Sequence, residues 1–167
     1  MSVFNKQQGV GLVEVLVALV LLSIGILGFV ALQVRAMDAS NEATNRTMAI
    51  NLARDLAERI RVNRSAFSDY KTAVNTKKTA SGCLSSKSIS YIPNCDTKKM
   101  AEFDSAEITA KAQSIGQSIR IDECKGSSLN CIYVAWAETD ISNSIDQCVS
   151  ATGTYVENSK CIVMEAF

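Results

Sequence analysis

The sequence contains no histidine, and proline occurs once in 167 residues. Histidine is the commonest general base and metal ligand near neutral pH, so its absence argues against most hydrolytic sites and most zinc sites. Lys+Arg and Asp+Glu number 17 each, which leaves no net charge to attract nucleic acid or acidic substrates. These absences favour a structural or binding protein over an enzyme.

Charge is also missing from one long stretch near the N-terminus. Residues 10–32 are almost entirely apolar and carry a single ionisable side chain, Glu14. About 20 apolar residues in a helix are enough to cross a bilayer. A carboxylate in such a segment costs about 2.5–3.5 kcal/mol at the membrane centre and less towards its ends, so it usually has a partner or a function.

A short polar segment, residues 1–9, precedes the apolar run and ends in Gly9. A small residue before an apolar stretch, with an acid five positions after it, is the pattern of a prepilin signal. In this respect the sequence resembles the type IV pilin family. Residues 14–28 look like the PilV group of minor pilins, and so do residues 52–63, a stretch that ends the long helix in that group.

The resemblance implies a specific sequence of processing and assembly. Prepilin peptidase would cut behind Gly9 and methylate the new N-terminus, Val10, where the family most often has phenylalanine. Glu14 would pair with a mature N-terminal amine during assembly. The chain would cross the inner membrane once, with a periplasmic C-terminal domain, and join other minor pilins and the major pilin near the pilus tip. No catalytic residue, metal or cofactor is implied.

Several other interpretations of the apolar run stay open. A secretory signal peptide is disfavoured because its apolar core has roughly 7–15 residues, fewer than this run. An ordinary membrane anchor would leave Glu14 unexplained. A buried core helix would need more surrounding chain than is present. A minor pseudopilin of a type II secretion system would be built in the same way as a pilin. A membrane-anchored periplasmic enzyme is disfavoured by the missing histidine.

The sequence predicts one continuous helix over residues 10–63. It contains no proline, and no glycine occurs between Gly28 and Gly82, although Gly25 and Gly28 leave a bend possible. The first half, 10–32, is apolar on all sides, and the second half, 33–64, is amphipathic, which is typical of a helix that leaves lipid and then covers a domain. The predicted apolar stripe comprises Met48, Ala49, Leu52, Ala53, Leu56 and Ile60.

Residues 65–167 are expected to form a disulfide-stapled globular domain, giving an α+β fold in which the long helix packs on a small antiparallel sheet. The predicted elements are a loop over 65–96 with a short strand at 89–92, a helix over 98–115, strands over 118–123 and 131–138 joined by a turn at 125–128, a polar loop over 139–159 and a last strand over 161–167. Alternation places Ile119, Ile121, Ile132, Val134 and Trp136 on one face of the sheet and Cys131, Tyr133 and Ala135 on the other.

Six cysteines, all after residue 80, indicate three disulfides formed in an oxidising compartment. Their spacings are too wide for the CxxC pairs of zinc or redox sites. Of about fifteen possible pairings, neighbour pairing is favoured because each pair then closes one turn or loop. The favoured pairs are Cys83–Cys95, Cys124–Cys131 and Cys148–Cys161.

Two further clusters allow a ligand hypothesis beside a simpler one. Asp140, Asn143 and Asp146 could bind calcium, but their spacing differs from an EF-hand, so a solvated loop is favoured. A lysine-rich surface could contact DNA, as in DNA-uptake pilins, but it lacks the interleaved aromatic residues of a single-strand binder. The lysines concerned are Lys71, Lys77, Lys78, Lys87, Lys98 and Lys99.

Overall fold

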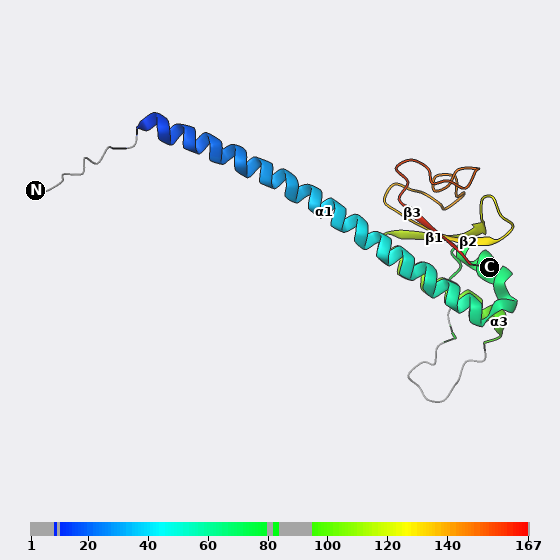
Figure 1. Cartoon of the computed structure of the whole chain (residues 1–167). Helices are drawn as coiled ribbons and strands as arrows, with labels where there is room; N and C mark the ends of the chain where they lie inside the picture. The colour runs from blue at the N-terminus through cyan, green and yellow to red at the C-terminus, as the bar shows by residue number, and fades with distance from the viewer. Residues whose placement is uncertain (1–8, 10, 80–81, 84–94, 167) are drawn as a thin grey trace, which may run out of the picture. The chain divides into compact units, whose positions relative to one another are not determined.

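The computed structural model describes residues 9, 11–79, 82–83 and 95–166 (Figure 1). The predicted strand at 89–92, the new N-terminus Val10 and most of the leader lie outside the described residues. The elements are α1 (Leu12–Val62), a 3-10 turn η1 (Arg64–Ala66), α2 (Phe67–Asn75), α3 (Thr97–Ser114), β1 (Gln117–Glu123), β2 (Asn130–Trp136) and β3 (Cys161–Glu165). The fold class is α+β, as predicted. The chain forms two compact units, Met1–Ala43 and Thr44–Phe167, which are described separately.

The long helix α1 is confirmed as one uninterrupted α-helix, which continues through both Gly25 and Gly28. Within the second unit it buries Ala49, Leu52, Ala53, Leu56, Ala57 and Ile60. The prediction that Met48 belongs to this stripe is wrong, because Met48 is 40% exposed. Ala57, beside Leu56, completes the stripe instead, at the three- and four-residue spacing of a helix face.

The interpretation of residues 65–96 as a loop is wrong at its start, where η1 and α2 form. The buried residues there are Ala66, Tyr70, Ala73 and Val74, which recur at helical spacing. The Tyr70 hydroxyl donates a 2.5 Å hydrogen bond to Asp104 on α3, so α2 is fixed to α3 by a polar contact as well as by packing. Two alanines and two larger side chains among polar neighbours give a weak hydrophobic period, which is why the sequence signal was missed.

The sheet is antiparallel with the order β1-β2-β3. Its register pairs Ile119 with Val134 and Ile121 with Ile132, and these four side chains belong to the core formed with α1, α2 and α3. The predicted division of the two faces is confirmed, since Cys131, Tyr133 and Ala135 belong to a second core. β2 is therefore buried on both faces.

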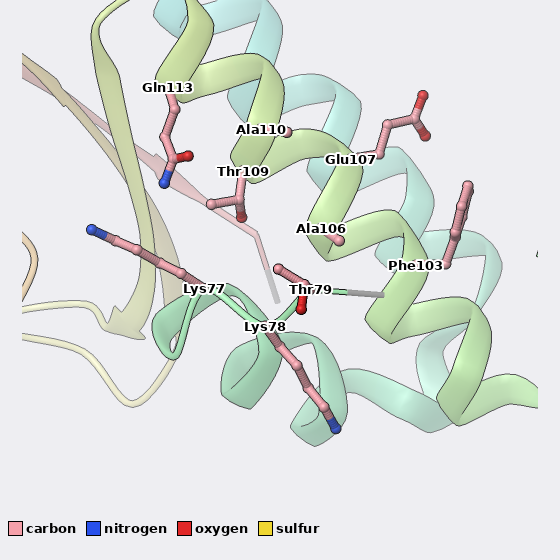
Figure 2. A pocket seen from close by; sticks show the side chains of 9 residues that line it. All are labelled: Lys77, Lys78, Thr79, Phe103, Ala106, Glu107, Thr109, Ala110 and Gln113. Atoms are coloured by element: carbon pink, nitrogen blue, oxygen red, sulfur yellow. The ribbon is translucent and has the colours of Figure 1, made fainter. Parts of the chain in front are cut away.

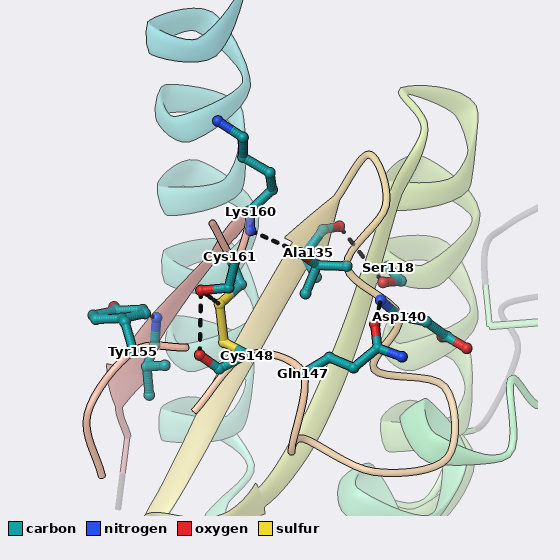
Figure 3. The surroundings of a disulfide bond; sticks show 11 residues. Ser118, Ala135, Asp140, Gln147, Cys148, Tyr155, Lys160 and Cys161 are labelled. Carbon is teal, nitrogen blue, oxygen red and sulfur yellow. Dashed lines mark hydrogen bonds between the residues drawn. A yellow bond between two sulfur atoms is a disulfide. The ribbon is translucent and has the colours of Figure 1, made fainter. Parts of the chain in front are cut away.

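The stretch 139–159 forms much of that second core, so its description as a polar loop is incomplete. Ile141, Ile145 and Val149 are nearly fully buried against the outer face of β2. The Cys148–Cys161 disulfide joins this stretch to β3, as Figure 3 shows. Apolar residues far apart in a polar sequence thus give the sheet a cover that has no regular secondary structure.

The three disulfides join the same pairs that the sequence analysis favoured, Cys83–Cys95, Cys124–Cys131 and Cys148–Cys161. The second closes the β1–β2 hairpin, whose turn is also held by the 2.8 Å hydrogen bond from the Cys124 N–H to the Leu129 carbonyl. Each closed loop restricts the unfolded chain and adds about 2–4 kcal/mol to the free energy of unfolding.

An arginine-centred cluster connects α1 to α3. The Arg59 guanidinium lies 2.9 Å from Asp55, 2.7 Å from Asp104 and 2.7 Å from Glu107, while the Lys111 ammonium lies 3.4 Å from Asp55. Burial alone would raise the pKa of Asp55, but the hydrogen bonds and charges of Arg59 and Lys111 outweigh it, and the pKa of Asp55 is lowered. Asp55 is therefore a stabilising carboxylate whose contribution depends on pH.

We predict that Asp55→Asn costs about 1 kcal/mol near neutral pH, the upper range for partly exposed ion pairs. Because the pKa of Asp55 is lower in the folded than in the unfolded chain, its contribution is complete above the unfolded value, 3.8, and is lost as the pH falls through the folded value. Denaturant unfolding of the full chain in detergent micelles, followed by the fluorescence of the single tryptophan, Trp136, measures this.

The difference between wild type and Asp55→Asn should shrink as the pH falls below 3.8. Glu58→Gln is the matched control, since Glu58 pairs with Arg61 on a highly exposed part of the same helix. A pH-independent difference for Asp55→Asn would contradict the ion-pair account.

The hairpin turn packs closely on the loop that covers the second core. Gly153 has φ +83°, and a Cβ at that position would lie 2.8 Å from the Lys125 carbonyl oxygen. Gly126, in the turn itself, has φ +87°, but a Cβ added there would meet open space. Both glycines thus have a left-handed backbone conformation, but only Gly153 lies so close to another part of the backbone that a side chain would not fit.

Gly126→Ala should cost about 1 kcal/mol from backbone strain alone, while Gly153→Ala should cost a further 1–3 kcal/mol, roughly, because the two loops must move apart. The same denaturant titration measures both. Equal costs would show that the contact between Gly153 and Lys125 does not constrain the fold.

Candidate functional site: the exposed apolar helix and its N-terminal end

The first unit presents large apolar side chains along α1 with no protein cover. Those between Leu12 and Val34 are about half exposed or more, from 46% for Val30 to 77% for Leu12. Among the described residues, α1 is the one helix long and apolar enough to cross a membrane. Residues 12–32 would span about 31 Å as a helix, which matches a hydrocarbon core of about 30 Å.

The polar groups within this segment are few. The Ser23 hydroxyl donates a 2.7 Å hydrogen bond to the Leu19 carbonyl, so this donor is satisfied within the helix. The Glu14 carboxylate is exposed and has no hydrogen bond or ion pair with the residues that the structure describes. Glu14 is therefore the one side chain of the apolar segment that needs a partner from elsewhere.

Glu14 lies in the first turn of α1, where the Gly11 carbonyl accepts hydrogen bonds from the Glu14 and Val15 N–H groups at 2.9 and 3.3 Å. The helix N-terminus carries a partial positive charge, which favours a carboxylate in this turn. Gly9 lies before the helix and is exposed, and a Cβ added to it would meet no other atom within 4 Å. An exposed glycine, five residues before an acid that has no partner among the described residues, thus lies at the N-terminal end of an apolar helix.

The comparisons with known proteins cover this region and part of the second unit. Residues 4–30 match the prokaryotic N-terminal methylation motif, and residues 31–106 match the family described as type IV pilin Tt1218. Over these residues the chain is similar to type IV pilins. No curated protein and no solved structure matches it significantly.

The matched family is one of structural subunits that assemble with other pilins after processing by prepilin peptidase. The matched residues end inside α3. The sheet and the disulfides Cys124–Cys131 and Cys148–Cys161 therefore lie in the part of the chain beyond the match.

The acidic loop that could have bound calcium uses its polar groups internally. The Asp140 carboxylate accepts a 2.8 Å hydrogen bond from the Ser142 N–H, which lowers the pKa of Asp140, and the Asp140 N–H donates to Gln147 (Figure 3). Asp146 lies 3.5 Å from the Lys125 ammonium. In the part of the chain that the structure describes, no three His, Cys, Asp or Glu residues gather as a metal site.

Three of the lysines considered for DNA contact are paired with carboxylates. Lys78 lies 2.6 Å from Glu102, Lys71 3.8 Å from Asp122 and Lys98 4.0 Å from Asp69. Lys87 lies outside the described residues. The paired lysines contribute less to a positive surface than the sequence suggests.

A hollow of about 400 Å³ lies between α3 and residues 77–79 (Figure 2). Thr109 lines it, and the buried Thr109 hydroxyl has no hydrogen-bond partner among the described residues. Phe103 and Glu107 are also lining residues, and in Figure 2 their side chains point away from residues 77–79. No local sequence pattern predicts this hollow, because it exists only once α2 places residues 77–79 beside α3.

Proposed function

We propose that this chain is a minor subunit of the PilV kind, which primes or modifies the assembly of a type IV pilus. The observation that carries the proposal is the unpartnered Glu14 carboxylate on an otherwise apolar, uncovered helix, directly after Gly9. A plain membrane anchor gains nothing from this carboxylate and bears its cost in lipid. An assembling subunit needs it as one half of an ion pair.

The proposed parts of the chain follow the proposed sequence of events. Residues 1–9 are the leader, 10–32 the transmembrane and assembly segment, 33–64 the amphipathic half of the helix, and 65–167 the periplasmic domain. The precursor sits in the inner membrane, prepilin peptidase cuts behind Gly9, and the amine of Val10 is methylated. The disulfides favour the periplasm for the domain, since they form in oxidising compartments.

The proposed mechanism is a transfer of the apolar helix from lipid to a bundle of pilin helices. Apolar side chains are about equally well solvated by lipid tails and by neighbouring helices, so they do not direct the transfer. The Glu14 carboxylate does, because it is costly in lipid and is stabilised when it pairs with the N-terminal amine of a neighbouring subunit. Other minor pilins and the major pilin are the proposed neighbours, near the tip of the pilus.

The Glu14→Leu variant tests this mechanism. It should still be cleaved and inserted, but incorporation into pili should fail, because a neighbour's amine is left unpaired in an apolar surrounding. Breaking a buried ion pair in this way costs about 3–5 kcal/mol, which is more than a hundredfold in an association constant. Surface piliation and copurification with other pilins, at equal expression, are the measurements.

Asp38→Leu is the matched control, because Asp38 is an exposed carboxylate on the same helix beyond the apolar segment. It should assemble like wild type. If Glu14→Leu also assembles like wild type, Glu14 has no part in assembly and the proposed function is wrong.

A further inference from the structure

The two edges of the sheet are closed to different extents. At the β1 edge, the side-chain amide of Asn75 donates a 2.8 Å hydrogen bond to the Ile121 carbonyl and accepts a 3.0 Å bond from the Ile121 N–H. Asn75 thereby occupies the outward main-chain donor and acceptor of Ile121, which an added strand would use. Such protection of an edge prevents pairing with other chains.

The β3 edge has less protection. The residues that flank β3 are bonded to β2. The Trp136 N–H donates a 2.9 Å hydrogen bond to the Lys160 carbonyl, and the Ala166 N–H donates a 3.0 Å hydrogen bond to the Asn130 carbonyl. Since neighbouring residues of a strand alternate, the main-chain groups of residues 161, 163 and 165 face away from β2. An added strand could bond only to those of these main-chain groups that are neither buried nor already hydrogen-bonded.

Its first half is covered. Cys161 is buried at the disulfide to Cys148, and the Val163 N–H donates to the Tyr155 hydroxyl at 3.2 Å. The Val163 carbonyl and both main-chain groups of Glu165 have no hydrogen-bond partner within the described part of the chain. Glu165 is also exposed. The open edge is therefore Val163–Glu165.

A groove of about 350 Å³ adjoins this open edge. Ala57 on α1 and Met164 on β3 supply apolar lining. The charged residues that line it are of both signs: Arg54, Arg61, Glu58 and Glu165. Arg61 is paired with Glu58 at 2.6 Å. Arg54 has no carboxylate within ion-pair distance among the described residues, so it is the cation available to a partner.

We propose that the Val163–Glu165 edge binds an extended acidic segment of another protein as a fourth strand. Its main chain bonds to Val163 and Glu165, one apolar side chain lies beside Met164, and a carboxylate on the same face reaches Arg54. Main-chain bonds supply affinity in this mode of recognition, and alternate side chains supply specificity. The inference goes beyond the proposed function, because it uses neither Glu14 nor the apolar helix.

The test uses the full chain in detergent micelles and a capped heptapeptide, Thr-Val-Thr-Glu-Thr-Val-Thr, whose valines and glutamate share one face when extended. Its counterpart carries lysine in place of glutamate. Titration by NMR gives the affinities, and amide hydrogen exchange reports whether the Glu165 N–H becomes protected. Glu165→Pro removes this outward donor and spares the bonds to β2, while Glu165→Ala keeps it.

We expect saturable binding of the glutamate peptide, protection of the Glu165 amide, and binding at least as tight by Glu165→Ala. Glu165→Pro should bind about tenfold or more weakly, from the lost bond and the blocked strand. Arg54→Gln should lose the preference for the glutamate peptide over the lysine peptide.

Three results would each overturn the proposal: no saturable binding, unchanged binding by Glu165→Pro, or equal binding of the two peptides by the wild type. Protection of the Glu165 amide that rises with protein concentration alone would also overturn it, since the edge would then pair with a second copy of the chain. None of these outcomes bears on Glu14, so they leave the proposed function to its own test.

Discussion

The apolar half of α1 cannot be left in water. Each fully exposed valine, leucine, isoleucine or phenylalanine costs about 1.5–3 kcal/mol relative to a buried one, and residues 12–34 carry a long series of them on all sides. The total is tens of kcal/mol, which exceeds the roughly 5–15 kcal/mol of net stability in a typical folded domain. Lipid or other apolar helices must cover this segment, and a family of subunits that assemble from the membrane meets that requirement in two successive environments.

The second unit solves a different problem, which is to stabilise a three-stranded sheet of limited size. β2 is buried on both faces, by the helices on one side and by the stretch 139–159 on the other. That stretch consists of turns and one isolated bridge, with no helix or strand among its elements, and the Cys148–Cys161 disulfide fixes it to β3. The Cys124–Cys131 bond holds the hairpin beneath it. Covalent links thus supply stability that a small core supplies only in part.

The sequence was most informative where the signal is local and repeated. The missing prolines and the continuous apolar run predicted α1, and strict alternation predicted the two faces of β1 and β2. Gly9 and Glu14 could be proposed as site residues because the prepilin pattern is contained in a few consecutive residues, and their roles stay predictions. The turn η1 and helix α2 were missed because their buried residues include the small side chains of Ala66 and Ala73, whose hydrophobic signal is weak. Ile141, Ile145 and Val149 were missed because their burial depends on a sheet face and a disulfide distant in sequence. The protection of β1 by Asn75 and the open edge at Glu165 depend on strand register, which sequence patterns do not give.

The central claim is that this chain is processed and assembled as a pilin, and the intact mass of the protein in sheared, purified pili tests it most directly. The account predicts a chain that begins at Val10, carries one N-terminal methyl group and retains three disulfides. It also predicts that Gly9→Arg stays at precursor size in the membrane and is missing from the pili. A full-length chain with Met1 intact in assembled pili, or a mature chain found only in the membrane of piliated cells, would contradict the account.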